Sequence, residues 1–408
     1  MISYDDALAL LLKEAKGAVN VEFVELCQSL GRVLACDVRA NENYPALPTA
    51  AMDGYACLAS DIKTGAKLEI IGLTPAGLLP ENSIKSGQCV KTFTGALMCE
   101  NSDTLLPIEN IEFSENSKNS SLENSENSNN YIIVKEPVKK GFALRQIGES
   151  YKKGEILVKA GTRIDYSVIC VLSELGIASV CVFKKPKVAI LATGSELIEP
   201  GFAKKNPAQS YNSNAYGLFA LLSSWGCEPQ IIKSIKDDKE AIESTLKTAL
   251  SGCDILVSTG GVSVGDFDFM RDFVRQSGEI IIDKVAIKPG RHIKVAKIAS
   301  KMLFALPGFS YSALVTAILF IRPYISALFG SKMNFIKTAV LAHDYAQKGH
   351  LENFSAASIT SQDGKLFIST ENKKQGSSAI SVNLLENSVL LRSSKSAKKG
   401  DIVEFIKI

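Results

Sequence analysis

The segment Asp254–Asp268 combines the residue types that most often bind anionic ligands or metals. An apolar run leads into Gly260-Gly261, and Asp266 and Asp268 follow at the start of a predicted helix. Amide groups of a glycine loop at a helix start bind phosphate, whereas carboxylates there bind a metal ion or a ligand's hydroxyl and amino groups. Aspartates in a first helical turn also serve simply as caps, so this segment alone leaves both roles open.

Three further polar positions follow apolar runs in the same part of the chain. Thr193-Gly194-Ser195-Glu196 comes after the run 188–191, Asp237 comes after the run 230–235, and Lys288 and Arg291 lie on a Pro-Gly turn. Side chains at the carboxyl ends of parallel strands share one crevice. We therefore expect convergence of Glu196, Asp237, Gly260, Gly261 and Asp268. The two cations favour an anionic ligand, with ordinary surface residues as the alternative.

Candidate binding residues also occur in the first 150 residues. Asp53 lies in a predicted Asp53-Gly54 tight turn, where it could face a ligand or only reverse the chain. Thr94 follows a predicted strand, so its hydroxyl and the adjacent amides are candidate anion ligands, with a plain turn as the alternative. Arg145 could pair with a phosphate.

Hydrophobic periodicity predicts an α/β multidomain protein. A capped helix begins near Ser3, and short alternating strands at 68–71, 88–93 and 131–134 predict a small β-domain. Strands and helices then alternate, which predicts a doubly wound, mostly parallel sheet. The predicted elements are strands 188–191, 230–235, 255–257, 280–285 and 302–306, and helices 164–175, 214–225, 239–250 and 311–321.

The same patterns set the predicted domain boundaries. Residues 1–48 and 139–182 form an N-terminal domain, and 49–138 the small β-domain, which carries a flexible Ser/Asn/Glu-rich insert at 112–130. Residues 183–330 form the α/β domain, and 331–408 a C-terminal β-domain.

Composition excludes several classes of protein. Lys+Arg 46 against Asp+Glu 43 gives a net charge of +3, too little for a nucleic-acid-binding surface. Nine cysteines without a C-x-x-C pair, with three histidines, support neither a disulfide framework nor a zinc site. The N-terminus is acidic, and the apolar run 313–321 ends at Arg322-Pro323, short of a membrane span. We expect a soluble, cytoplasmic protein.

Eight segments, in order along nearly the whole chain, resemble the signature segments of one family, the molybdopterin molybdenumtransferases (MoeA), to which the E domain of gephyrin belongs. They are Gly31–Leu34, Ala51–Ala56, Phe93–Ala96, Arg145–Glu149, Ala189–Gly194 with Glu196, Thr259–Asp266, Lys284–Gly290 and Ala305–Gly308.

The resemblance implies an elongated homodimer, with the N-terminal domain forming the dimer interface. It implies a site between the α/β domain of one subunit, molybdopterin-binding in type, and the small β-domain of the other. Asp53 and Thr94 would face Glu196, Asp237, Asp268 and Lys288 as the catalytic groups. Members of the family insert molybdate into adenylylated molybdopterin and release AMP with a divalent metal such as Mg²⁺.

Acids suit the metal and the pterin ring, and lysine and loop amides suit phosphate and molybdate. Glu196 and Asp268 are the implied metal ligands, and the molybdopterin adenylyltransferase is a candidate partner. Further implied ligand-binding positions are Arg145, Thr193, Gly194, Gly260, Gly261, Ser263, Arg291, Pro307, Gly308 and Ser377.

Four departures from the family pattern bear on activity. Ser150 and Ser195 stand where the family has aspartate, Arg291-His292 where it has Lys-Pro, and Phe309-Ser310 where it has Asn-Pro. Losing acids lowers metal affinity and makes the crevice more positive. An active transferase, a pterin-binding scaffold or weakly active paralogue, a member with altered oxyanion preference, and a nucleotidyltransferase akin to the adenylyltransferases remain as alternatives.

Overall fold

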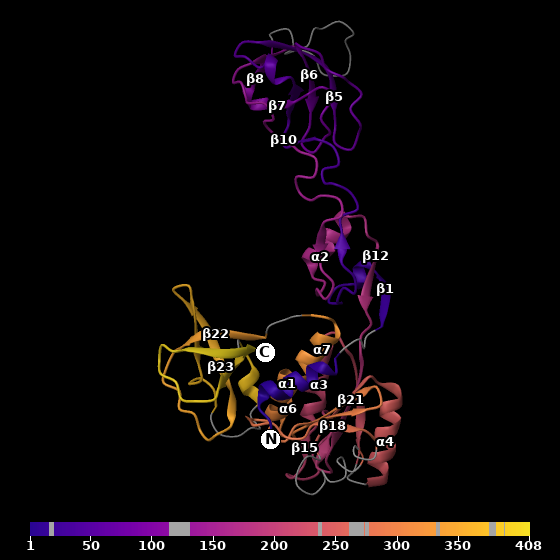
Figure 1. Ribbon diagram of the computed structural model, residues 1–408, viewed down its shortest axis with the longest axis vertical. Coiled ribbons are helices and arrows are strands. Elements are labelled where there is room, and N and C mark those ends of the chain that lie inside the picture. Colours follow the sequence, from indigo (N-terminus) through magenta and orange to yellow (C-terminus); the bar gives the residue numbers. More distant parts are fainter. Residues whose placement is uncertain are drawn as a thin grey trace. The chain divides into compact units, whose positions relative to one another are not determined.

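The structure is a computed structural model, and it describes residues 1–15, 20–113, 131–235, 239–260, 273, 277–331, 335–374, 381–386 and 388–408. The chain divides into two compact units, Asp37–Val158 and the combination of Met1–Cys36 with Lys159–Ile408. Both units appear in Figure 1.

The unit Asp37–Val158 is the predicted small β-domain with its flanking strands. One sheet has the order β7-β4-β6-β5-β9-β8, and two short pairs, β10-β3 and β11-β2, adjoin it. Its core contains Tyr55, Leu68, Leu106 and Ile132, which are at most 2% exposed. The strands are β2 Val38–Arg39, β3 Thr49–Ala50, β4 Gly54–Cys57, β5 Lys67–Thr74, β6 Gln88–Thr92, β7 Thr104–Pro107, β8 Ile111–Phe113, β9 Tyr131–Val134, β10 Leu144–Arg145 and β11 Ile156–Val158.

Strands β8 and β9 pair antiparallel on either side of the predicted insert, with Ile111 opposite Val134. The predicted start of the insert at 112 is wrong, because Glu112 and Phe113 belong to β8. Residues 114–130 lie outside the described part of the chain.

Replacing residues 114–130 by a short turn is expected to leave the melting temperature nearly unchanged. A Ser/Asn/Glu tract gains little from burial, and shortening a loop changes its closure entropy only logarithmically. Thermal unfolding tests this, with Ile132→Ala, at a fully buried position, as the destabilising control. A fall of more than about 5 °C, on the order of 1–2 kcal/mol, would show that the segment packs.

The other unit begins with helix α1 (Tyr4–Lys13), which Ser3 caps by accepting a hydrogen bond from the Asp6 amide at 3.1 Å. Strands β1 (Val21–Glu25) and β12 (Ser179–Phe183) form an antiparallel pair. Helix α2 (Tyr166–Glu174) is capped by Asp165 and contacts the 3-10 turn Leu26–Gln28 that follows β1.

The predicted doubly wound sheet is present and has the order β16-β13-β17-β21-β20-β18. The first four strands are parallel, and β20 runs antiparallel to both of its neighbours, β21 and β18, because the chain reverses directly between β20 and β21. The bounds are β13 Lys187–Thr193, β14 Leu197–Ile198, β15 Ser210–Tyr211, α3 Ser213–Ser224, β16 Glu228–Ile235, α4 Lys239–Gly252, β17 Ile255–Thr259, β18 Glu279–Ile282, β20 Lys294–Ile298 and β21 Lys301–Leu306.

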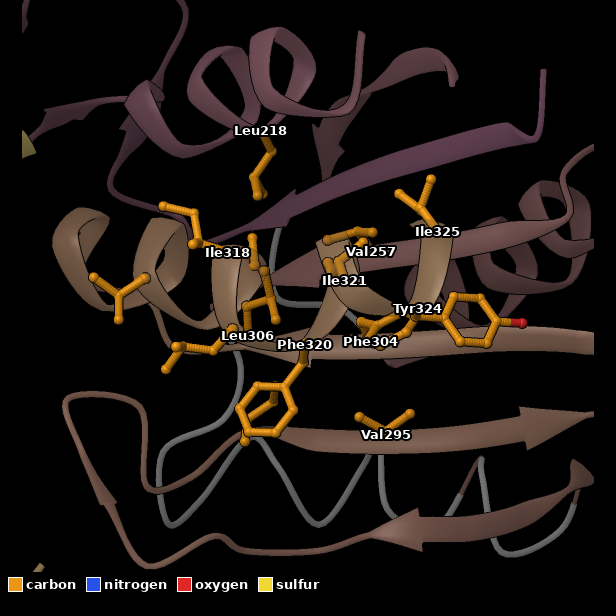
Figure 2. Close-up of a cluster of buried hydrophobic side chains, with 14 of the residues drawn as sticks. Leu218, Val257, Val295, Phe304, Leu306, Ile318, Phe320, Ile321, Tyr324 and Ile325 are labelled. Carbon is orange, nitrogen blue, oxygen red and sulfur yellow. The ribbon is translucent and has the colours of Figure 1, made fainter. Parts of the chain in front are cut away.

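Alternating side chains of these strands pack on opposite faces of the sheet. Ile190 and Val257 belong to a cluster with α3 and the helix after β21, whereas Leu191 and Leu256 pack with Leu246 of α4. Figure 2 shows part of the first cluster, in which Phe304 of β21 packs against Tyr324 of the helix that follows this strand, with ring centroids 5.6 Å apart. Helices thus cover both faces of the sheet.

The helix after β21 does not end at Arg322-Pro323, so that prediction is wrong. It runs from Ser310 to Leu328 as α6 (Ser310–Thr316), a π-helical turn (Ala317–Ile321) and α7 (Arg322–Leu328). Proline removes the hydrogen bond to the carbonyl four residues earlier. That carbonyl, of Leu319, accepts a hydrogen bond from the Tyr4 hydroxyl at 3.4 Å instead. By length and apolarity this one helix could span a membrane, but 78% of it is buried inside the protein, as in a core helix.

The predicted C-terminal β-domain is a six-stranded sheet with the order β19-β23-β24-β22-β26-β25. Its bounds are β19 Ile287–Lys288, β22 Ile336–Leu341, β23 Glu352–Gln362, β24 Lys365–Ser369, the 3-10 turn Ser381–Leu384, β25 Ser388–Ser393 and β26 Ile402–Lys407. The edge strand β19 lies between β18 and β20 in the sequence but pairs with β23, so a segment of the α/β part of the chain belongs to the C-terminal sheet. The division of the chain into four domains with the boundaries given above stays a prediction.

Candidate functional site

The carboxyl ends of β13, β17 and β21 meet at a close backbone contact. Gly260, after β17, has φ +85°, and a Cβ atom there would lie 2.3 Å from the Thr193 carbonyl oxygen. A Cβ atom on Gly308, after β21, would lie 3.7 Å from the Gly260 Cα. The structure therefore brings Thr193, Gly260 and Gly308 together at one edge of the sheet, and glycine at 260 is required there.

Glu196 lies over the backbone of the first of these loops. Gly194 has φ +147°, and a Cβ atom there would lie 2.7 Å from each carboxylate oxygen of Glu196. The carboxylate is exposed and is a hard oxygen donor of the kind that Mg²⁺ prefers. No group of three acidic, histidine or cysteine side chains suited to a metal occurs among the described residues.

Five predicted site residues fall outside the part of the chain that the structure describes. Their roles stay predictions, and Glu196 is the predicted metal ligand whose position is known. The five are Asp237, Gly261, Ser263, Asp268 and Ser377.

Lys288 and Arg291 line a cavity of about 490 Å³ together with Pro307. Lys288 belongs to β19 and lies opposite Asn353 of the C-terminal sheet. Gly290 packs against the helix after β21, since a Cβ atom there would lie 2.1 Å from the Thr316 methyl carbon. The C-terminal domain therefore forms one wall of this cavity.

The cavity lining is cationic on both walls. Lys348, Lys373 and Lys374 of the C-terminal domain add to Lys288 and Arg291, and no aspartate or glutamate occurs among the described lining residues. Sequence reasoning missed these three lysines, although the adjacent pair Lys373-Lys374 next to a turn was a signal. Such a pocket favours a ligand with more than one anionic group.

Apolar side chains lie between these cations. Phe309, Tyr311 and Phe354 also line the cavity. The Tyr311 hydroxyl donates to the Phe354 carbonyl at 3.4 Å and accepts from the Ala356 amide at 2.9 Å, so its ring is fixed. Phe309 is 63% exposed, whereas Tyr311 and Phe354 are buried, so Phe309 offers the flat apolar surface that a ring-containing anion requires beside the charges.

Sequence reasoning also missed Asn214, which holds the loop after β21 in place. Its amide donates to the Gly308 carbonyl at 2.7 Å from the first turn of α3. Its side-chain oxygen is buried and has no hydrogen-bond partner within the described structure. An asparagine near a helix start is so common that the sequence contained no signal for this role.

His292 lines the same cavity, and burial together with Arg291, Lys284 and Lys294 lowers its pKa below the usual range. It is therefore neutral near pH 7 and gains a positive charge as the pH falls through that lowered pKa. A unit charge about 4 Å away contributes about 1 kcal/mol in water, or about fivefold in affinity.

Sulfate, which stays a dianion, is expected to bind up to about fivefold more tightly once the pH has fallen below the lowered pKa of His292 than at neutral pH. Isothermal titration calorimetry measures the change, and His292→Gln is expected to remove most of it. An equal pH dependence in both proteins would assign the effect to another group.

Asp53 and Thr94 are joined directly in the unit Asp37–Val158. One Asp53 carboxylate oxygen accepts hydrogen bonds from the Thr94 amide and hydroxyl, both at 2.7 Å. These bonds, with Lys91 nearby, hold the pKa of the fully exposed Asp53 carboxyl below its usual range. The pair therefore presents a fixed, ionised carboxylate to solvent.

The predicted Asp53-Gly54 tight turn is wrong. Gly54 is the first, buried residue of β4, and a Cβ atom there would lie 2.4 Å from the Leu106 carbonyl oxygen. Glycine is needed for this close approach between strands rather than for a turn.

Arg145 lies in β10, which pairs with β3. Its guanidinium donates to the Ser150 hydroxyl at 2.7 Å, contacts Glu149 at 3.5 Å and lies 5.5 Å from the centroid of the Tyr44 ring. Ser150, where the resemblance leads one to expect aspartate, accepts this bond without neutralising the cation. Arg145 keeps more of its charge available to an anion.

Comparisons with known proteins were made against families, curated sequences and solved structures. A family model described as the MoeA N-terminal region (domain I and II) matches residues 2–176, and one described as a probable molybdopterin binding domain matches residues 189–327.

Similar proteins cover most of this chain. The molybdopterin molybdenumtransferase of Bacillus subtilis is 32% identical over 89% of this chain and 84% of its own length. That of Haemophilus influenzae is 30% identical over 81% and 79%. A solved molybdopterin biosynthesis moeA protein from Pyrococcus horikoshii OT3 aligns over 100% of both chains, with 26% identity and a TM-score of 0.81.

Proposed function

The chain belongs to the molybdopterin molybdenumtransferase family, and from that premise we propose that it inserts molybdate into adenylylated molybdopterin and releases AMP. The observation that carries the proposal is the cavity lined by Lys288, Arg291 and three further lysines without an acid among its described lining residues. The proposed substrates are a pterin nucleotide with phosphate groups and the oxyanion molybdate, and both are anionic. The flat pterin ring suits the aromatic side chains that line the cavity.

The described residues take distinct roles in this reaction. Lys288 and Arg291 neutralise the oxyanion and the phosphates, and the amides around Gly260 and Gly308 orient the ligand. Glu196 would hold Mg²⁺, which offsets negative charge on the phosphoanhydride as it breaks. With Asp268 as the second predicted ligand, the acids would lie at the glycine loops and the cations in the adjoining cavity.

We also propose that the active protein is a homodimer. Asp53 and Thr94 belong to one compact unit, whereas Glu196 and Lys288 belong to the other. In a homodimer, Asp53 and Thr94 of one subunit would complete the site of its partner subunit, as the resemblance implies. We further propose a cytoplasmic location, and the molybdopterin adenylyltransferase as the source of the adenylylated substrate.

Purified protein incubated with adenylyl-molybdopterin, molybdate and Mg²⁺ tests the proposal through AMP release. We expect release to depend on molybdate and Mg²⁺, and parallel reactions with tungstate measure oxyanion preference. Tight binding of the pterin nucleotide without AMP release would support the scaffold alternative.

A further inference from the structure

Two cysteines from distant parts of the sequence lie side by side where the chain leaves one compact unit for the other. The sulfur atoms of Cys36 and Cys181 are 3.5 Å apart. Cys36 is the last residue of its unit before the chain enters the unit beginning at Asp37, and Cys181 lies in β12. Both thiols are free, Cys36 exposed and Cys181 partly exposed.

Backbone hydrogen bonds fix this juxtaposition. Leu34 and Val182 form an antiparallel bridge, and the Ala35 amide donates to the Cys181 carbonyl at 3.0 Å. The Phe183 amide donates to the Val33 carbonyl at 2.9 Å. The two cysteines therefore lie opposite each other at the end of a short antiparallel pairing.

We propose that Cys36 and Cys181 form a redox modification site, which a low-molecular-weight disulfide converts reversibly into an intramolecular disulfide. A disulfide bond is about 2.05 Å long, so the sulfurs must approach each other by less than about 2 Å. Side-chain rotation at the exposed Cys36 can supply that movement.

The reaction balances in two exchanges. The Cys36 thiolate attacks the small disulfide and releases one small thiolate, which leaves a mixed disulfide on Cys36. The Cys181 thiolate then attacks the Cys36 sulfur and releases the second small thiolate. The protein loses two hydrogens, and the oxidant becomes two thiols.

The order of attack follows from exposure. Partial burial and the neighbouring Cys36 raise the pKa of the Cys181 thiol, so Cys36 is the sulfur that meets the oxidant first. The disulfide joins Cys36, where the chain passes from one unit to the other, to Cys181 of β12. It therefore restricts backbone rotation at residues 36 and 37. This inference does not depend on the proposed catalytic function.

The test treats the full-length protein with excess oxidised glutathione, then counts thiols after unfolding and maps peptides by mass spectrometry. We expect a peptide that joins residues 36 and 181 without glutathione on either, glutathione adducts on other exposed cysteines such as Cys27 and Cys170, and full recovery of the nine thiols with dithiothreitol. Amide exchange at Ala35 is expected to slow by about tenfold in the oxidised protein, because local opening at this end of the pairing becomes rarer.

Matched variants make the result specific. Cys36→Ser and Cys181→Ser are expected to abolish the linked peptide, with a glutathione adduct accumulating on Cys36 in the second. Cys27→Ser and Cys170→Ser, which remove exposed cysteines of the same region, are expected to leave it unchanged. Retention of all nine thiols, pairing of other cysteines, or a covalent dimer on a non-reducing gel would overturn the proposal.

Discussion

Replacing Lys288 by alanine is expected to lower the rate of AMP release about a hundredfold or more, because removing one preorganised charge donor typically has an effect of that size. Lys288 lines the cavity, and the pairing of β19 with β23 holds its backbone at the C-terminal sheet. The side chain is exposed, and the melting temperature should therefore stay unchanged.

Lys337→Ala is the control, since Lys337 is an exposed lysine of β22 that does not line the cavity. Its rate should stay within about twofold of the unmodified protein, since an exposed charge outside the site is well screened. Equal losses in both variants would reduce the role of Lys288 to general surface charge.

The Lys288→Ala variant also tests whether the site is shared between subunits. Asp53→Asn removes the charge of the exposed acid in the other unit and should be inactive by itself. Mixing and reassociating the two inactive proteins should restore about a quarter of the activity, because half of the dimers are mixed and each contains one intact site. A site built within one chain would show no recovery.

Gly260→Ala is the second large effect expected. Its φ of +85° disfavours any side chain, and the new methyl group would overlap the Thr193 carbonyl oxygen at 2.3 Å. The strain and the displaced loop should cost at least about 2 kcal/mol of stability and most of the activity. Chemical denaturation and the AMP assay measure the two losses.

Gly201→Ala is the control that separates the cost of a left-handed backbone from the cost of steric overlap. Gly201 has φ +95°, but nothing lies within 4 Å of a Cβ atom built there. This control should lose only about 1 kcal/mol through the left-handed backbone and keep its activity. If Gly260→Ala costs no more than this, the close contact of the glycine loops does not constrain the site.

Local sequence patterns predicted much of the fold. The continuous apolar run at 188–191 and the alternating pattern at 131–134 fall inside β13 and β9, because burial on two faces or one leaves a direct trace in the sequence. Ser3 predicted the start of α1 because its hydroxyl caps that helix locally.

Features that depend on distant contacts could not be predicted in this way. Pro323 looked like a helix end, but the Tyr4 hydroxyl binds the carbonyl that proline leaves free. Gly54 looked like a turn residue, yet it is needed because the Leu106 backbone lies against it.

The residues of the candidate site differ in the same way: local sequence marked some of them, and distant contacts bring in the others. Thr94 and Glu196 follow the ends of strands that the sequence marks, whereas Asp53 and Lys288 were predicted in turns but lie just before β4 and in β19. The adjacent pair Lys373-Lys374 was a weak signal, but its link to Lys288 could not be predicted, because the two meet only when β19 joins the C-terminal sheet.

The most direct test of the proposed function is transfer of molybdenum itself. The protein is incubated with adenylyl-molybdopterin, molybdate and Mg²⁺, and the product is added to a molybdenum-free apoenzyme whose activity reports the finished cofactor. We predict that apoenzyme activity appears in step with AMP and is lost with Lys288→Ala. AMP release without active cofactor, or neither product from folded protein, would contradict the assignment of this chain as a molybdenum-inserting enzyme.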